Sequence, residues 1–176
     1  EVILATNTSS MSITSIAEAT QRPDKVVGMH FFNPVPIMKL CEIIRGHATS
    51  DEAVATTTEF AQAMGKLTVE VKKDTPGFIV NRILMPLFVE AAWLYETGVA
   101  SKEDIDIAIK AGLNHPMGPF ELMDFTGVDI GYNVINYFHE ELNKELKWTL
   151  PHTFKDLVKA GKHGRKTGAG WYDYKK

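Results

Sequence analysis

Along the first 74 residues, short apolar runs alternate with segments whose apolar residues recur at helical spacing. Short apolar runs that end in Asn, Ser, Pro or Gly predict strands, and apolar residues at helical spacing predict helices. The predicted strands are residues 2–5, 26–32, 38–44 and 67–71, with helices over 12–20 and from a capping box at 49–52 to Gly65. We expect the first strand to be buried, because it is apolar throughout. Strand and helix in alternation indicate an α/β layer with parallel strands.

The pattern changes at Asp74–Gly77, after which no strand is predicted until the last few residues. Apolar stripes at helical spacing predict helices over 78–96, from a cap at Ser101, over 121–142 and around Phe154. Pro86 lies inside the first of these helices, where it should bend the helix or leave a carbonyl group that needs another partner. We therefore predict two domains: residues 1–74 form an α/β layer, and residues 75–176 form an all-α domain.

Composition places the chain among ordinary globular proteins, with 44% apolar and 23% charged residues. The 19 basic and 22 acidic residues give a net charge of −3, which argues against a nucleic-acid partner bound through a basic face. No apolar run approaches the roughly 20 residues that span a bilayer, so no membrane partner is predicted. The single cysteine, Cys41, excludes an internal disulfide and a cysteine-cluster zinc site, and it fits a reducing compartment.

His30 lies at the end of a predicted strand and is followed by two aromatic residues. Ligand sites in open α/β sheets lie beyond the carboxyl ends of strands, and an imidazole titrates near neutral pH, so His30 could act as a general base. Glu42 follows across a short Pro-containing turn, which could return its carboxylate to the imidazole and hold one ring tautomer. The alternative is that His30 is a hydrogen-bonded core residue and Glu42 a surface charge.

Three further polar side chains are candidates for a site. Ser9 and Ser10 follow the first predicted strand, where a hydroxyl either binds a substrate oxygen or, more commonly, caps the next helix. Asn81 lies near the start of the 78–96 helix, where its amide could donate to a carbonyl oxygen or serve as a polar residue at the domain junction. A Ser-His-Glu hydrolase could be assembled from these residue types, but no Gly-x-Ser-x-Gly motif surrounds Ser9.

Metal binding is not predicted, because the other histidines lack a second ligand at i+3 or i+4 beyond acids on ordinary solvated faces. The Gly-rich segment Gly164–Gly170 matches neither the dinucleotide fingerprint nor the Walker spacing, since it does not follow a strand and open a helix. A flexible terminal turn is the simpler interpretation, although a basic residue there could reach a phosphate.

Taken in order, several motifs together resemble the L-3-hydroxyacyl-CoA dehydrogenase family, and the short-chain 3-hydroxybutyryl-CoA dehydrogenases are the most similar members. The motifs are Asn7–Ser10, His30–Leu40, Glu42–Ile44, Asp74–Arg82, His115–Leu122 and Gly164–Tyr172. They cover essentially the whole chain, and their combination is highly specific. The resemblance implies that residues 1–74 are the C-terminal half of a Rossmann-like dinucleotide-binding domain, and that residues 75–176 are a helical domain for dimerisation and substrate binding.

The resemblance also implies an activity, the reversible NAD- or NADP-linked oxidation of the 3-hydroxyl of an acyl-CoA, in fatty-acid or butanoate metabolism. His30 matches the family's catalytic base and Glu42 matches its carboxylate partner. Ser9 and Asn81 match the residues that hold the substrate oxygen. The implied cofactor contacts are Ser9, Asn33 and Lys166. The terminal basic segment thereby gains a functional interpretation.

The sequence departs from the family because the N-terminal Gly-x-Gly-x-x-Gly turn and the acidic ribose ligand are absent. It also starts at Glu1 inside an apolar run, without a Met or a signal peptide, so we expect a piece of a longer protein. A hydride carrier must be held at near-attack distance, so we expect this chain by itself to be inactive or nearly so. Missing strands would leave an open sheet edge and bare apolar surface.

The resemblance further implies a homodimer through helices between Phe78 and Leu142, in a bacterial cytoplasm or, in a eukaryote, the mitochondrial matrix. Two alternatives stay open. One is a relative that oxidises a free hydroxy acid, such as an L-gulonate-type dehydrogenase or a crystallin derived from one, in which His30 and Glu42 would serve equally. The other is a non-catalytic dimerisation module.

Overall fold

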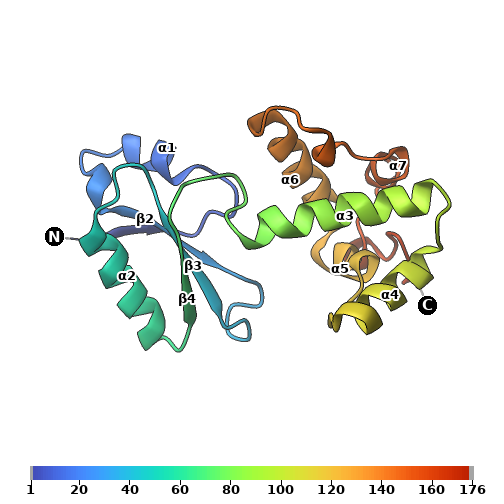
Figure 1. Cartoon of the computed structure of the whole chain (residues 1–176), viewed down its shortest axis with the longest axis horizontal. Coiled ribbons are helices and arrows are strands. Elements are labelled where there is room, and N and C mark those ends of the chain that lie inside the picture. The colour runs from blue at the N-terminus through green and yellow to red at the C-terminus, as the bar shows by residue number, and fades with distance from the viewer. Residues whose placement is uncertain (1, 175–176) are drawn as a thin grey trace. The chain divides into compact units, whose positions relative to one another are not determined.

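The computed structural model describes residues 2–174, which form two compact units (Figure 1). The first unit, Glu1–Arg82, contains a four-stranded sheet with helices, and the second, Ile83–Lys176, is helical. The predicted α/β layer followed by an all-α domain is therefore confirmed. Among the residues described, no helix has the length and apolar character needed to cross a bilayer.

The strands of the first unit follow one another across the sheet in chain order. They are β1 (Leu4–Thr6), β2 (Val26–Phe31), β3 (Leu40–Arg45) and β4 (Leu67–Val71). β1 and β2 are parallel, as are β3 and β4, but β2 and β3 are antiparallel. The prediction of parallel strands is wrong at this central pair. Residues 32–39 are too few for the crossover that parallel neighbours need, so the chain returns directly.

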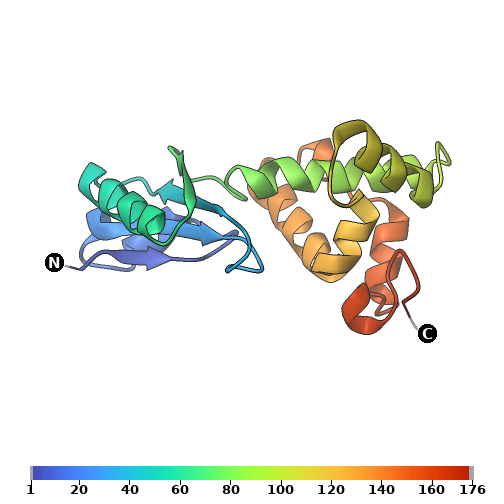
Figure 2. The ribbon, with the colours of Figure 1, turned by 90° about the horizontal axis from the view of Figure 1, so that it is seen from below.

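Side chains alternate between the two faces of this sheet, as successive strand residues must. The face beside α1 (Ile13–Glu18) has a buried core of Ile13, Ala17, Val26, Ile44, Val71 and Phe78. The opposite face is covered by α2 (Asp51–Ala63), which lies across the strands in Figure 2. Its buried core is Val27, Met29, Cys41, Ile43, Val54 and Ala61. His30 and Glu42 therefore share the α1 face with Val26 and Ile44.

β1 is an edge strand of the described sheet and not the buried strand that we predict from its apolar run. Val2 and Leu4 are 65% and 38% exposed, and Phe60 on α2 is 60% exposed. Within residues 2–174, β1 pairs only with β2. The structure therefore shows the expected open edge, with apolar side chains bare beside it.

Ser50 is the N-cap of α2, one residue later than the capping-box spacing predicts. Its hydroxyl oxygen accepts a hydrogen bond from the backbone N–H of Ala53 at 3.2 Å. Thr49, the expected cap, is buried instead, and its hydroxyl donates to the carbonyl oxygen of Val26 at 2.6 Å. A backbone carbonyl inside the core needs a donor, and this need takes Thr49 away from the helix.

The second unit is built from short and medium helices. They are α3 (Val80–Glu96, which starts in the first unit and contains Pro86), α4 (Lys102–Leu113), α5 (Pro119–Thr126), α6 (Val128–Glu141) and α7 (His152–Lys159). Single 3-10 turns occur at Leu146–Trp148 and Arg165–Thr167 in this unit, and at Pro23–Lys25 in the first unit. Ser101 caps α4 as predicted. The single helix predicted over 121–142 is wrong, because Gly127 at φ 109° separates α5 from α6.

Two buried carboxylates tie the C-terminal segment to the helices of this unit. Asp106 on α4 accepts a hydrogen bond from the hydroxyl of Tyr172 at 2.7 Å. Asp124 on α5 accepts from the backbone N–H groups of Trp171 and Tyr172 at 2.8 and 2.9 Å. Burial raises the pKa of Asp106 above its usual value, against the opposing hydrogen bond from Tyr172. The segment that includes Gly164–Gly170 is therefore packed against the unit, and the simpler interpretation of a flexible turn is wrong.

Candidate active site

Strands β2 and β3 place His30 directly opposite Glu42. In the antiparallel register, the Cα of His30 is paired with the Cα of Glu42, so both side chains leave the sheet on the same face. The short turn between the strands makes this pairing possible, as the sequence predicted. The hydrogen bond joins Nδ1 of His30 to Oε2 of Glu42 at 2.7 Å.

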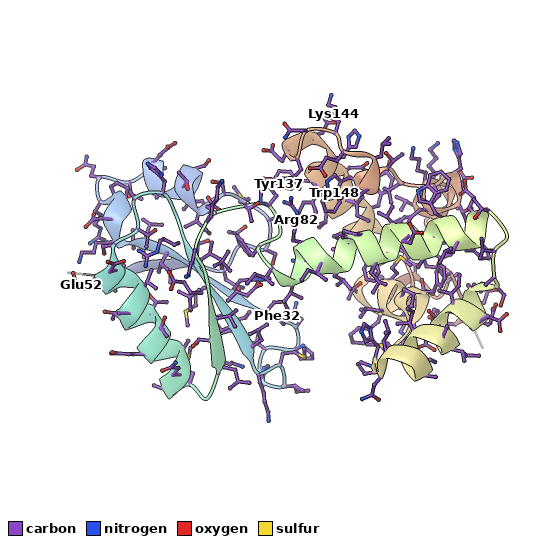
Figure 3. The ribbon with its side chains drawn as sticks, in the orientation of Figure 1. Phe32, Glu52, Arg82, Tyr137, Lys144 and Trp148 are labelled. Carbon is purple, nitrogen blue, oxygen red and sulfur yellow. The ribbon has the colours of Figure 1, made fainter. Side chains whose placement is uncertain are left out.

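Both members of this pair are withdrawn from solvent. His30 is 2% exposed and Glu42 is fully buried, so the interpretation of Glu42 as a surface charge is wrong. The imidazole is enclosed by two aromatic rings: Phe32, labelled in Figure 3, lies 4.6 Å away between ring centroids, and Phe78 lies 5.4 Å away edge to face. Apolar walls exclude water and strengthen the electrostatic interaction between carboxylate and imidazole.

The second oxygen of Glu42 binds the start of α3. Oε1 accepts hydrogen bonds from the backbone N–H groups of Ile79 and Val80 at 3.1 and 3.0 Å. Val80 is the first residue of α3, whose leading N–H groups have no partner within the helix. The positive end of the helix dipole favours a negative charge at this place. Glu42 therefore has the partners that a buried carboxylate needs.

The other side of the imidazole faces a hydroxyl. Nε2 of His30 lies 3.1 Å from Oγ of Ser9, which is an exposed residue beyond the end of β1. Asn7 holds this loop against β2, because its side-chain oxygen accepts from the backbone N–H of Phe31 at 3.1 Å. The carboxyl ends of the parallel strands β1 and β2 thus meet at one edge of the sheet, where ligand sites of open α/β sheets form.

This arrangement determines what the imidazole can do. A carboxylate can only accept hydrogen bonds. Nδ1 of His30 is therefore the protonated ring nitrogen, and it donates the hydrogen bond to Oε2 of Glu42. Nε2 then presents a lone pair toward Ser9 and can accept a proton from a hydroxyl group bound there. The imidazolium that forms would be stabilised by Glu42. The geometry is that of a general base with an orienting carboxylate.

The structure brings together Ser9, His30 and Glu42, whereas Asn33 and Asn81 take no part in that cluster of hydrogen bonds. Asn33 is exposed after β2, and Asn81 is partly buried in the first turn of α3. Among residues 2–174, neither side-chain amide has a hydrogen-bond partner. The functional roles of Asn33 and Asn81 stay predictions.

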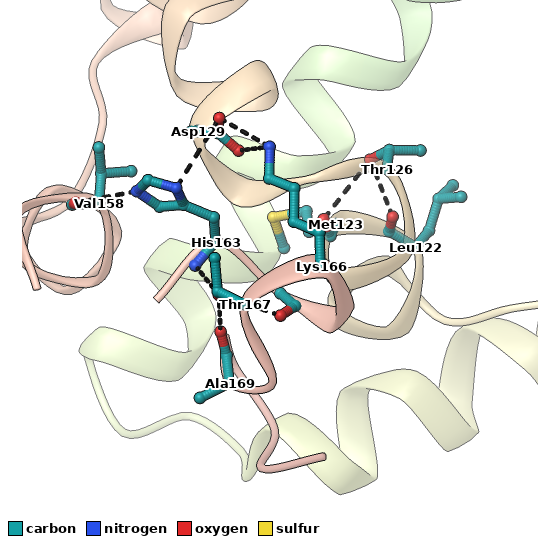
Figure 4. Close-up of polar contacts among 10 residues, drawn as sticks. Leu122, Met123, Thr126, Asp129, Val158, His163, Lys166, Thr167 and Ala169 are labelled. Carbon is teal, nitrogen blue, oxygen red and sulfur yellow. Dashed lines mark hydrogen bonds and ion pairs between the residues drawn. The ribbon is translucent and has the colours of Figure 1, made fainter. Parts of the chain in front are cut away.

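Lys166 belongs to the helical unit, where its Nζ lies 2.6 and 2.8 Å from the two carboxylate oxygens of Asp129 (Figure 4). His163 Nδ1 lies 3.9 Å from the same carboxylate. Burial would raise the pKa of Asp129, but the hydrogen bond and the charge of Lys166, together with His163, bring it below its usual value. The amine of Lys166 is therefore held at the start of α6 by an ion pair.

Two features of the site escape the sequence analysis. Nothing in the pattern indicates that the N–H groups of Ile79 and Val80 bind Glu42, because the contact joins residues far apart in the chain. The packing of Phe78 on the imidazole is equally hidden, since an apolar residue at a helix start predicts only burial. Within residues 2–174, no group of three or more His, Cys, Asp or Glu side chains is placed to hold a metal ion.

Two family profiles together match almost the whole chain. Residues 1–75 match the one described as "3-hydroxyacyl-CoA dehydrogenase, NAD binding domain". Residues 77–174 match the one described as "3-hydroxyacyl-CoA dehydrogenase, C-terminal domain". The change from one profile to the other falls at the Asp74–Gly77 segment, where the hydrophobic pattern also changes.

Individual relatives agree with these profiles. The chain is 51% identical over 176 residues to a 3-hydroxybutyryl-CoA dehydrogenase of Clostridioides difficile, which covers 100% of this chain and 62% of the relative. It is 51% identical over 174 residues to the mitochondrial hydroxyacyl-coenzyme A dehydrogenase of Homo sapiens, covering 98% of this chain and 55% of the relative. A solved structure, the (S)-3-hydroxybutyryl-CoA dehydrogenase of Ralstonia eutropha, superposes with a TM-score of 0.95 at 45% identity, over 99% of this chain and 61% of that one. The chain thus spans little more than half the length of these proteins.

Proposed function

Because the chain belongs to the 3-hydroxyacyl-CoA dehydrogenase family, we propose that its protein oxidises (S)-3-hydroxyacyl-CoA thioesters, 3-hydroxybutyryl-CoA among them, reversibly at the 3-hydroxyl group. The observation that carries this proposal is the buried pair in which Glu42 orients His30 while Nε2 of the imidazole faces the Ser9 hydroxyl. The names of the relatives supply the substrate class, and the pair supplies the base that the reaction requires.

His30 performs the proton transfer in this proposal. A substrate 3-hydroxyl bound beside Ser9 gives its proton to Nε2 of His30, and the positive charge that develops on the ring is stabilised by Glu42. Bound NAD or NADP would supply the acceptor for a hydride from the same carbon atom. In the reverse direction His30 returns the proton to the carbonyl oxygen. Hydrogen-bond donors at Ser9 and Asn81 hold the substrate oxygen, a contribution of about 3 kcal/mol for a well-placed donor.

The cofactor is supported by the residues at the sheet edge. The exposed hydroxyl of Ser9 and the unpaired amide of Asn33 follow the carboxyl ends of β1 and β2, where a dinucleotide binds in this class of sheet. Lys166 supplies a cation from the helical unit. We assign these three residues to cofactor binding, with NAD favoured by the description of the profile that matches residues 1–75.

A homodimer through the helical unit forms part of the proposal. Several large apolar side chains of this unit are exposed. They are Ile83 at 70%, Val99 at 67%, Ile107 at 58%, Leu113 at 60%, Phe125 at 50% and Ile130 at 52%. Burying them against a second copy would remove this surface from water. Light scattering that finds only monomers would contradict the dimer.

We place the reaction in fatty-acid or butanoate metabolism, in a bacterial cytoplasm or a mitochondrial matrix. The relatives include a bacterial 3-hydroxybutyryl-CoA dehydrogenase and mitochondrial enzymes of Sus scrofa and Homo sapiens, so both settings occur among proteins similar to this chain. The acyl-CoA substrate class is common to both.

The proposal is tested by measuring NADH formation from (S)-3-hydroxybutyryl-CoA with the complete protein. We expect turnover with the CoA thioester and little with free 3-hydroxybutyrate or L-gulonate; preference for a free acid would favour the alternative hydroxy-acid dehydrogenase. His30→Gln should lower kcat by several orders of magnitude, about 10³-fold or more, because the base is lost while the fold keeps a polar group. Near-normal turnover of His30→Gln would remove His30 from the base role.

Calorimetry separates the enzyme from a non-catalytic dimerisation module. Titration of the complete protein with NADH and, separately, with acetoacetyl-CoA should release or absorb heat with saturable binding. No heat from either ligand would favour the module. An activity assay on residues 1–176 tests the expectation that this chain by itself is inactive or nearly so.

A further inference from the structure

The turn that leads into α3 has an unusual backbone. Gly77 and Phe78 both adopt positive φ, at 77° and 50°. Glycine accepts this conformation readily, but a phenylalanine there is strained by about 1–3 kcal/mol, and such residues concentrate at functional sites. Phe78 is 3% exposed and belongs to the core on the α1 face of the sheet, so the strained residue is firmly held.

This backbone conformation has a direct consequence for Glu42. The two N–H groups that follow the left-handed residue Phe78, those of Ile79 and Val80, both donate to Oε1 of Glu42. One oxygen of the carboxylate thus accepts hydrogen bonds from the start of α3, and the other is hydrogen-bonded to His30. Any relaxation of the turn at Phe78 would move both amides together.

The side chain of Phe78 acts on the other member of the pair. Its ring meets the imidazole of His30 edge to face, with 5.4 Å between centroids and an angle of 63° between the ring planes. Phe32 closes another side of the imidazole at 4.6 Å. One residue therefore contacts His30 through its ring and controls Glu42 through its backbone.

We propose that Phe78 is a positioning residue for the His30–Glu42 pair: its strained turn fixes the amides that hold Glu42, and its ring fixes the orientation of the imidazole. This inference rests on the proposed function for its catalytic consequence, but the geometry that it describes is measurable without any substrate. The strain at Phe78 is tolerated because the buried ring and the two backbone hydrogen bonds to Glu42 together hold the turn in this conformation.

The test uses Phe78→Leu in the complete protein, with Phe138→Leu as the matched control. Leucine keeps the position apolar but removes the ring that faces His30, whereas Phe138 is a fully buried ring of the helical unit. We expect Phe78→Leu to lower kcat about 10- to 100-fold, because small misplacements of a catalytic group are costly, with little change in KM. The pH profile of kcat should also move, and Phe138→Leu should leave both kcat and its pH profile unchanged below its melting temperature.

A spectroscopic readout distinguishes this inference from the proposed function. The proton between Nδ1 of His30 and Oε2 of Glu42 should give a downfield NMR resonance in the wild type that Phe78→Leu shifts or broadens and Phe138→Leu leaves in place. If the wild type lacks dehydrogenase activity, the proposed function fails while this resonance still tests the positioning. If Phe78→Leu does not fold, Phe78→Met refills the core with a flexible side chain and no ring face, and the same changes are expected. Wild-type kcat, pH profile and resonance in a folded Phe78 variant would overturn the inference.

Discussion

Oε2 of Glu42 lies 2.7 Å from Nδ1 of His30, and the two residues face each other across β2 and β3. The carboxylate is fully buried, yet each of its oxygens has hydrogen-bond donors, the imidazole on one side and two backbone amides on the other. Hydrogen bonds at both oxygens fix the orientation of the carboxylate. The bond from Nδ1 to Oε2 in turn fixes the orientation of the imidazole ring.

Glu42→Gln tests this relationship in the complete protein. The amide nitrogen of glutamine would donate to Nδ1 of His30, so the ring would carry its proton on Nε2 and could no longer accept one from the substrate. We expect kcat to fall about 10³- to 10⁴-fold and its pH dependence to change. Glu52→Gln is the matched control, because Glu52, labelled in Figure 3, is an exposed residue of α2. Its carboxylate is paired with Lys25. An unchanged pH–rate profile in Glu42→Gln would count against the pairing.

Cys41 is expected to resist chemical modification. It is fully buried on the α2 face, and burial raises the pKa of its thiol to about 11, with Lys66 opposing and Glu42 adding to the shift. The thiolate is the reactive form, so iodoacetamide at pH 8 should label the unfolded chain and leave the folded chain unlabelled. Mass spectrometry with and without denaturant measures this directly, and rapid labelling of the folded chain would contradict it.

The same thiol makes stability fall in alkaline solution. The unfolded chain loses the thiol proton near pH 9 and the folded chain near pH 11, so the free energy of unfolding contributed by Cys41 is lost as pH rises through this window. Cys41→Ala removes this contribution. Denaturant unfolding between pH 8 and pH 11 should therefore show a shallower decline in the variant, and equal slopes would be the contrary result.

Gly170→Ala should destabilise the helical unit. A Cβ at this position would lie 2.0 Å from Oδ1 of Asp124 and 2.6 Å from the Cα of Gly164, so the backbone must shift and the bonds of Asp124 to the C-terminal segment would weaken. We expect the free energy of unfolding to fall by about 3 kcal/mol. Gly112→Ala in α4 is the control, because nothing lies within 4 Å of its added Cβ. That change should raise stability by roughly 0.5–1 kcal/mol, as alanine is the better helix former.

Lys166→Met tests the cofactor contact assigned to the helical unit. Its amine is paired with Asp129, and loss of the cation should weaken NADH binding by the complete protein about ten-fold, the effect of one lost charge-assisted contact of ~1.4 kcal/mol. Lys162→Met, at an exposed position four residues earlier, is the control and should bind NADH as the wild type does. Fluorescence titration measures both dissociation constants. Equal affinity in Lys166→Met would remove this residue from the cofactor site.

The local elements of this fold were largely predictable. Apolar runs mark β2, β3 and β4, and helical spacing marks α1, α2, α3 and α7, because these patterns depend only on neighbouring residues. The change of hydrophobic pattern at Asp74–Gly77 was visible for the same reason. The local pattern failed where a contact with a distant residue determined a side chain's role. The hydroxyl of Thr49 donates to the carbonyl oxygen of Val26, so Ser50 caps α2 instead.

In the candidate site, too, features that depend on neighbouring residues were predicted and contacts between distant segments were not. The ordered motifs identified the family and the residue types, and the short turn between His30 and Glu42 predicted their pairing. Two contacts could not be predicted: the hydrogen bonds from the α3 amides to Glu42, and the packing of the Phe78 ring on His30. Both join segments separated by more than 30 residues.

The sequence by itself determined most of the helices and strands and the family to which the chain belongs, because hydrophobic period and motif order depend only on the order of residues along the chain. Only the tertiary structure decided that β2 and β3 run antiparallel, that β1 lies at an open edge, and that Glu42 is held from two sides. Strand direction and buried hydrogen bonds depend on which distant segments meet, and that is a property of packing in three dimensions.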